Sequence, residues 1–247
     1  MSQSLGAIAL LALGSSAFGQ CPGDCAPANP DGTFGNGVVN VDDLIEVVAA
    51  FGSANGPADV APTPCGNNTV NVDDMVFVIT AFGDCPPFDN DFCDQPQALF
   101  IDFPLMVGDN ILATDDNALN CETSLDGLSD GSAPSQSSGG RWYCVLGNGN
   151  ELTLSTCGDN SMFGFTFYQT FINVYCGDCV DPVCVGDSAD TITCGLGPFA
   201  SMSWCAEEGV SYRVLIHGLQ NDIGEEYIME VMDTGMPCET PISCGAS

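Results

Sequence analysis

The sequence predicts an α+β protein of two parts, a small all-α unit followed by an antiparallel β-sandwich of the jelly-roll kind. Two observations support this prediction: an acidic phrase that occurs twice near the N-terminus, and a series of short β-rich runs after it. The 247 residues are enough for two hydrophobic cores. Composition changes near residue 88, so we place the all-α unit at 20–88 and the sandwich at 89–247.

The first 19 residues are predicted to be a secretory signal peptide. They contain no charged side chain, an apolar run at 5–13, and the small residues Ala17 and Gly19 at the cleavage-site positions. This run is too short to cross a bilayer as a permanent anchor, and no other apolar stretch approaches 18 residues. We therefore expect a protein that is secreted or held at the cell surface, without a transmembrane segment.

The chain is strongly acidic. It has 33 Asp and Glu against two Arg and no Lys, which gives a net charge of -31, while 45% of its residues are hydrophobic. The hydrophobic content argues against disorder. The charge repels nucleic acid and anionic lipid, which excludes nucleic-acid-binding functions. Two compatible interpretations of the charge stay open, a solvated salt-tolerant surface and specific cation binding.

The 15 cysteines all follow the predicted signal, which is typical of disulfides in an exported protein. Four fall in the first part: Cys21, Cys25, Cys65 and Cys85. The other eleven begin at Cys93, so we expect the odd cysteine, free or paired between chains, among these. A zinc cluster at Cys176, Cys179 and Cys184 is the alternative, but it lacks a fourth ligand because the only histidine, His217, is distant in the sequence.

The doubled phrase is "GNGVVNVDDLIEVVAAFG" at 35–52 and "GNNTVNVDDMVFVITAFG" at 66–83, with eleven of 18 positions identical. In each copy an acidic, Asn-rich loop leads into an apolar run. The paired aspartates at 42–43 and 73–74 indicate helix N-termini, where acidic side chains are favoured. Apolar residues then recur at helical spacing until Gly52 and Gly83 end each helix.

The loop before each helix has the composition of a calcium loop, with oxygen-bearing side chains, a small residue at the sharp turn and a carboxylate at the helix start. Ca²⁺ takes six to eight hard oxygen ligands. "NGVVNVDDL" and "NNTVNVDDM" resemble the second half of a dockerin repeat, Asp-x-Asn-x-Asp-Gly-x-Val-Asn-x-x-Asp-Leu, a tandem relative of the EF-hand. This resemblance covers 21–88 and implies a module ordered by one or two Ca²⁺ ions.

The resemblance also implies the ligands. In the first loop they are Asp24, Asp31, Asn36, the Val38 carbonyl, Asn40 and Asp43, and in the second they are Asp59, Asn67, the Thr69 carbonyl, Asn71 and Asp74. The family's first aspartate position holds Gly32 and Thr63 here, so Asp24 and Asp59 act as displaced first ligands across longer loops. Asparagine at the fifth ligand lowers the anionic charge in both loops, so we expect weak affinity, about 10⁻⁴ to 10⁻³ M. The second loop has fewer acids, so we expect it to be the vacant one if only one ion binds.

Two short helices cannot bury every face of so apolar a sequence. We expect an exposed apolar surface, which typically marks a contact site, built from Ile45, Val48, Val76, Phe77 and Ile79. In dockerins this surface docks onto a partner module called cohesin, so the resemblance implies an extracellular, cohesin-like protein partner. Two alternatives stay open: the surface packs on the protein's own β domain, or the repeats are plain helical hairpins with acidic caps.

The second part is predicted as short strands separated by Gly, Asn, Asp and Ser clusters, with a long polar loop at 124–140 and no amphipathic helix. The strands are expected at 98–103, 110–114, 142–146, 151–156, 163–175, 191–194, 201–205, 211–217 and 227–232. Many short strands with polar turns favour an antiparallel sandwich. "GGRWYCVLGNGNELTLSTCG", "FINVYCGDC", "EEGVSYRVLIHG" and "GEEYIMEVMD" resemble the pre-peptidase C-terminal type of β-sandwich. That resemblance implies a non-catalytic accessory module of a secreted bacterial protein.

Candidates for catalysis and sugar binding are few. His217 lies in an alternating run and is predicted to be a strand residue rather than a base, and neither Gly-x-Ser-x-Gly nor His-Glu-x-x-His occurs. The pairs at 207–208 and 225–226 are candidate carboxylates for glycoside hydrolysis, but so acidic a chain contains such pairs in any case. Four aromatic residues either form a sugar-stacking face or belong to the core: Trp142, Tyr143, Trp204 and Tyr212.

We therefore expect an exported, non-enzymatic bacterial protein whose calcium-binding, dockerin-like module mediates extracellular docking or assembly. The alternative is a cell-surface protein that binds a carbohydrate or another polymer through the sandwich. A third possibility is an accessory component of polysaccharide degradation, because dockerins often accompany such enzymes.

Overall fold

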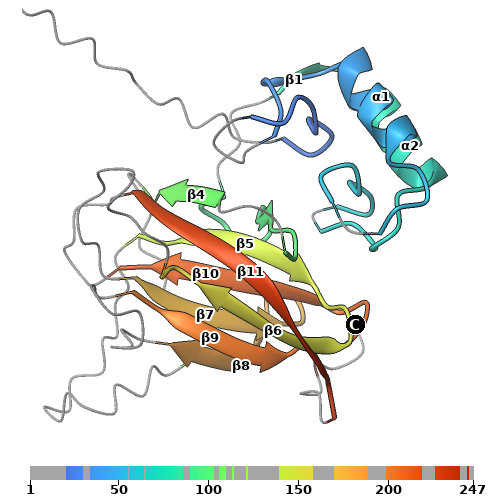
Figure 1. Cartoon of the computed structure of the whole chain (residues 1–247). Helices are drawn as coiled ribbons and strands as arrows, with labels where there is room; N and C mark the ends of the chain where they lie inside the picture. Colours follow the sequence, from blue (N-terminus) through green and yellow to red (C-terminus); the bar gives the residue numbers. More distant parts are fainter. Residues whose placement is uncertain are drawn as a thin grey trace, which may run out of the picture.

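The computed structural model describes residues 21–29, 34–54, 56–63, 65–85, 90–102, 106–109, 113, 121, 139–157, 170–188, 199–218, 226–239 and 244. A small helical unit lies beside two β-sheets (Figure 1). The predicted signal peptide, Asp31, Gly32, Glu225 and the strand at 191–194 lie outside the described residues, as do most of the strand at 110–114 and of the loop at 124–140. No helix among the described residues is long and apolar enough to cross a membrane.

Both helices begin where the repeat predicts them. Helix α1 (Val41–Ala49) and helix α2 (Val72–Thr80) each start after an asparagine N-cap whose side chain accepts a bond from the helix backbone. The aspartate at the third helical position accepts a bond from the backbone N–H of the N-cap, which completes a capping box in both copies. Local sequence alone therefore sets where each helix begins.

The structure does not support an all-α N-terminal unit. Strand β1 (Val38–Val39) pairs with strand β2 (Gly83–Asp84), and the backbone of Val70 pairs in the same manner with Gly52 and Ser53. The segment before each helix thus pairs with the segment after the other helix. Strands of two residues leave no hydrophobic alternation, which is why the sequence did not predict them.

The second part is β-rich, as predicted. One sheet has the order β3 (Gln97–Ala98), β5 (Arg141–Leu146), β10 (Ser211–His217), β7 (Phe171–Cys176) and β8 (Val183–Ser188). The other has the order β4 (Met106–Asp109), β11 (Glu226–Pro237), β6 (Asn150–Ser155) and β9 (Ser201–Cys205). Neighbouring strands are antiparallel except β3 and β5. One hydrophobic cluster draws residues from both sheets, so the two sheets enclose a common core.

Predicted and observed strands agree best where apolar and polar residues alternate. Strands β9 and β10 match the predicted ranges residue for residue, and β5 and β6 match within one residue. Strand β11 runs further than predicted, and the strand expected at 98–103 shrinks to β3 with a single bridge at Ile101. The sequence missed β4 and β8; β8 is a half-buried edge strand in a cysteine-rich segment without alternation.

Disulfides join distant parts of the chain. The described pairs are Cys21–Cys85, Cys65–Cys144, Cys93–Cys179, Cys121–Cys184, Cys176–Cys244 and Cys205–Cys238. Cys157 is also disulfide-bonded, and Cys25 is free and buried. The odd cysteine therefore lies in the first part, which corrects the expected even set, because Cys65 bonds to Cys144 of β5. The proposed zinc cluster is excluded, since its three cysteines are all in disulfides.

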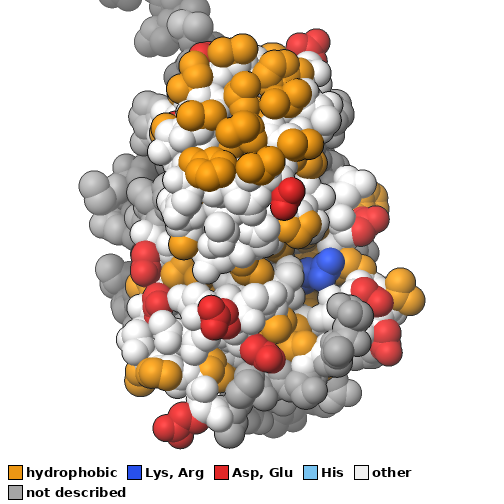
Figure 2. All heavy atoms as spheres, turned by 90° about the vertical axis from the view of Figure 1, so that its right-hand side faces the viewer, with side chains coloured by type: hydrophobic (Ala, Val, Ile, Leu, Met, Phe, Trp, Pro, Cys, Tyr) orange, Lys and Arg blue, Asp and Glu red, His pale blue; other side chains and the backbone are white. Residues whose placement is uncertain are grey.

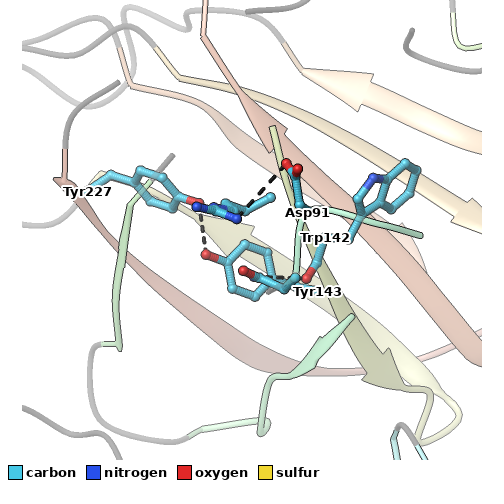
Figure 3. A network of polar contacts seen from close by, with 6 residues as sticks. Asp91, Trp142, Tyr143 and Tyr227 are labelled. Carbon is cyan, nitrogen blue, oxygen red and sulfur yellow. Dashed lines mark hydrogen bonds and ion pairs between the residues drawn. The ribbon is translucent and has the colours of Figure 1, made fainter. Parts of the chain in front are cut away.

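A buried polar contact links the two sheets. The hydroxyl groups of Tyr143 on β5 and Tyr227 on β11 lie 2.8 Å apart and point toward one another (Figure 3). Beside them Arg141 pairs with Asp91 at 4.0 Å. The sandwich thus contains specific polar links in addition to its apolar core.

Candidate functional site

The N-terminal unit contains the same local structure twice. The stretch from Asp24 to Pro27 has its counterpart from Asp59 to Pro62, and both contain a cis Ala-Pro peptide bond. Each stretch crosses the N-terminus of the helix of its own copy. The two helices lie side by side (Figure 1). The local backbone structure of one copy therefore recurs in the other.

The aspartate at the start of α1 is the centre of the first copy. Asp43 is fully buried, and its Oδ1 accepts hydrogen bonds from the backbone N–H of Cys25 at 2.8 Å and of Ala26 at 2.9 Å. Its Oδ2 accepts a third bond, at 2.7 Å, from the N–H of Asn40. One carboxylate thus ties the start of the loop to the start of the helix.

The second copy repeats this arrangement. Asp74 is also fully buried, and its Oδ1 accepts bonds of 2.8 Å from the N–H of Val60 and of Ala61. Its Oδ2 accepts a bond of 2.7 Å from the N–H of Asn71. The agreement holds although the second loop is shorter than the first.

A second aspartate holds the middle of each loop. Asp24 accepts bonds from the N–H of Asn36 at 2.9 Å and of Gly37 at 2.7 Å. Its counterpart Asp59 accepts bonds from the N–H of Asn67 and Asn68. Burial raises the pKa of Asp24 and of Asp59, the backbone bonds lower it in part, and the neighbouring helix aspartate raises it further.

The glycines that open the doubled phrase are required by these aspartates. Gly35 and Gly66 have φ values of +90° and +72°, in the left-handed region. A Cβ at Gly35 would collide with the carboxylate of Asp24, and one at Gly66 with that of Asp59. Each copy of the repeated phrase therefore begins with glycine because the backbone passes close to a carboxylate there.

The asparagines expected as ligands have local roles. The Asn36 side chain accepts a bond from the N–H of Val38 at 3.1 Å. The Asn40 side chain caps α1 and donates to the Val38 carbonyl at 3.1 Å. In the second copy Asn71 caps α2 and donates to the Thr69 carbonyl.

In a calcium loop of the EF-hand kind, the closing carboxylate binds the ion through both oxygens. The Oδ1 atoms of Asp43 and Asp74 already accept two N–H groups each, which occupies both lone pairs. Two residues after the displaced first ligand the chain has Ala26 and Ala61, which offer no side-chain oxygen. The described residues do not fit an EF-hand-like calcium site, and calcium binding stays an untested prediction of the resemblance.

One other group of metal-ligating residue types lies close together in the described part of the chain. It consists of Cys21, Asp24 and Cys85. Cys21 and Cys85 share a disulfide, so neither offers a thiolate. This group is not a metal site.

The outer surfaces of both helices form an apolar face. Its members are Val41, Ile45, Val48 and Phe51 with their counterparts Val72, Val76, Ile79 and Phe82, and their side chains are 46% to 59% exposed. Figure 2 shows apolar side chains gathered over the helical unit. Exposed acidic residues flank this apolar face: Asp42, Glu46 and Asp73.

The predicted contact residues only partly coincide with the apolar face. Ile45, Val48, Val76 and Ile79 are exposed as expected. Phe77 is half-buried and packs toward Gly23, so it does not belong to the face. The sequence reasoning missed the two members at each end of the face, although each copy carries them in a stripe with spacings of four, three and three residues.

The β-sandwich does not cover this face, because all eight side chains are exposed. The helical unit contacts the sandwich elsewhere, through the disulfide between Cys65 and Cys144 and an edge-to-face contact between Phe34 and Phe100 at 6.3 Å. The alternative that the exposed helix residues pack on the protein's own β domain is therefore not supported.

Both basic side chains of the protein are occupied within the sandwich. The Arg141 side chain is only 12% exposed and pairs with Asp91. Arg213 donates to the carbonyls of Cys93 and Gly177, and burial lowers its pKa. Because these are the chain's only Arg or Lys residues, the charged side chains that flank the apolar face are all acidic.

The other predicted candidates lie inside the sandwich or at its surface. His217 is buried; its Nε2 lies 2.8 Å from Asn173 Oδ1, its ring stacks on Phe171, and burial lowers its pKa. The pair at 207–208 is exposed between β9 and β10. The four aromatic residues weighed as a sugar-stacking face are all buried in the core: Trp142, Tyr143, Trp204 and Tyr212.

These aromatic residues therefore offer no surface to a sugar, and carbohydrate binding stays a prediction without support from them. Neither a comparison with models of known protein families nor a comparison with curated proteins finds a match for this chain.

Proposed function

We propose that the helical unit at 21–85 is a docking module through which this exported protein binds another extracellular protein. The observation that supports the proposal is the apolar face, eight half-exposed aliphatic and aromatic side chains in two-fold repeat. Monomeric proteins rarely expose contiguous apolar patches of this kind unless they contact a partner. The rigid support beneath the face, with disulfides and buried aspartates, limits the entropy lost on binding.

The apolar face is large enough for a reversible complex. Burying the exposed half of one such side chain returns on the order of 1 kcal/mol, so the eight together return about 8 to 12 kcal/mol. Association costs at least about 4 kcal/mol in lost translational and rotational freedom. The difference of about 4 to 8 kcal/mol corresponds to a dissociation constant between about 1 mM and about 1 μM from this face alone, before any contribution from its rim.

Charge defines the partner. Acidic residues flank the face, and the chain has a net charge of -31. A complementary surface therefore has an apolar centre and a rim of Lys and Arg, which accelerates association and orients the partner. A second copy of this chain and an anionic membrane both carry the wrong sign. The proposed occupant is thus a different protein with a basic rim around an apolar surface.

The test uses the full oxidised chain as bait against the extracellular proteins of the producing organism. A captured protein is identified by mass spectrometry, purified and titrated by calorimetry against the wild type and Ile45→Asp/Val76→Asp, which places charge at the centre of the face. Val180→Asp/Met236→Asp is the matched control, because both side chains are exposed apolar residues outside the face.

We expect the wild type and the control to bind equally, and the face variant to bind at least about 30-fold more weakly, because a carboxylate buried against an apolar surface lacks a partner. Equal binding by the face variant, with unchanged circular dichroism, would disprove the proposed docking surface. Reproducible absence of any captured protein would also count against it.

A further inference from the structure

We infer that the two aspartates of each loop are internal braces, which hold the helical unit folded through carboxylate-to-amide hydrogen bonds without bound calcium. The braces belong to the loops of the helical unit and not to the apolar face, so they act whether or not a partner docks there.

The braces connect segments that are distant in the sequence. The bond from the N–H of Cys25 to Asp43 spans 18 residues, and the bond from the N–H of Gly37 to Asp24 spans 13. Together with the bonds from Ala26, Asn36 and Asn40, five backbone N–H groups converge on two carboxylates in the first loop. Closing a long loop onto a helix N-terminus is the task that a calcium ion performs in an EF-hand-like loop. Here backbone amides close the loop instead.

Burial and charge make these bonds strong. Asp43 and Asp74 have no exposed surface, so water does not compete for their oxygens. Hydrogen bonds to an ionised carboxylate are roughly twice as strong as bonds between neutral groups. The helix N-terminus adds a favourable dipole for the negative charge. Each brace therefore has the partners that a buried carboxylate needs.

The second copy provides an independent observation. Its loop is shorter between the two aspartates, 15 positions from Asp59 to Asp74 against 19 from Asp24 to Asp43. Five backbone N–H groups nevertheless converge on its two carboxylates in the same pattern. What the two loops share is therefore the brace, and the residues between are free to differ.

Amide hydrogen exchange tests the inference directly, because the donors are known. The full oxidised chain is measured in excess chelator and in about 10 mM calcium, above the weak range of extracellular sites, with magnesium as the ionic control. We expect the amides of Cys25, Ala26, Val60 and Ala61 to exchange at least about 100-fold more slowly than unprotected peptide in chelator. Calcium should alter these rates less than about twofold.

Paired variants separate a brace from a metal ligand. Asp43→Asn/Asp74→Asn places an NH₂ group against N–H donors, whereas Asp42→Asn/Asp73→Asn removes the same charge from exposed neighbours. In the first pair of substitutions, we expect the four amides to exchange at least about tenfold faster than in the wild type, equally in chelator and in calcium. In the second pair we expect the exchange rates of the wild type.

Two outcomes would overturn the inference. One is that the four amides of the wild type exchange freely in chelator and gain protection along a saturable calcium curve. The other is that Asp43→Asn/Asp74→Asn keeps full protection in chelator and loses only a calcium response. Neither measurement involves a partner, so failure of the docking proposal would leave the result readable.

Discussion

The hydroxyl pair between the two sheets allows a sharp energetic prediction. Tyr143 and Tyr227 are each 1% exposed and approach to 2.8 Å from opposite sheets. Replacing either by Phe removes this bond from a buried site, which costs about 0.5–1.5 kcal/mol. The double variant loses the same bond only once, so it should lose about 0.5–1.5 kcal/mol less than the two single variants together.

Guanidinium denaturation followed by tryptophan fluorescence measures this cycle. The chain's two tryptophans, Trp142 and Trp204, are both buried in the sandwich, so the signal reports on that part alone. Combining Tyr143→Phe with Tyr212→Phe provides the control, because the Tyr212 hydroxyl bonds elsewhere, to the N–H of Glu207, and this pair should be additive. If the Tyr143 and Tyr227 variants were additive within about 0.3 kcal/mol, the hydroxyl contact would not link the sheets as described.

Two further predictions concern single buried groups. Burial lowers the pKa of His217 below its ordinary 6.5, so the unfolded chain takes up a proton that the folded chain refuses. The stability that this group contributes is present above pH 6.5 and is lost as pH falls below it. The difference in free energy of unfolding between the wild type and His217→Phe should therefore shrink between pH 7.5 and pH 5 in denaturant titrations. An unchanged difference would refute this. Cys25 is buried, burial raises the pKa of its thiol to about 12, and its counterpart in the second copy is Val60. Cys25→Val should change the free energy of unfolding by less than about 1 kcal/mol, and the native wild type should show no thiol that reacts with Ellman's reagent; rapid labelling would contradict the burial argument.

Local signals predicted much of the fold. Asn40 and Asn71 with the following aspartates define the helix starts, and alternation along β9 and β10 gave their exact extent. Disulfide and strand pairing between distant segments left no comparable signal in the sequence. The partner of Cys65 and the pairing of β1 with β2 depend on contacts between segments that spacing does not connect.

In the candidate site, too, the sequence predicted local features but not long-range contacts. The resemblance identified Asp43 and Asp74 as site residues. Their role depends on which backbone N–H groups bond to them, and the sequence does not predict those long-range contacts. The direction of Phe77 was missed because apolar residues occupy most positions of α2, so spacing alone did not separate its inner and outer sides. The apolar ends of the stripe could have been found from the repeat itself.

The exchange of short strands between the copies explains why the phrase occurs twice in one chain. The segment before each helix pairs as a strand with the segment after the other helix, and a disulfide between Cys21 and Cys85 joins the two ends of the unit. A single copy can make these strand pairings only with a second molecule, in an assembly that dilution would take apart. Covalent duplication makes that encounter intramolecular, at an effective concentration set by the connecting chain. The unit therefore stays assembled however dilute the protein becomes.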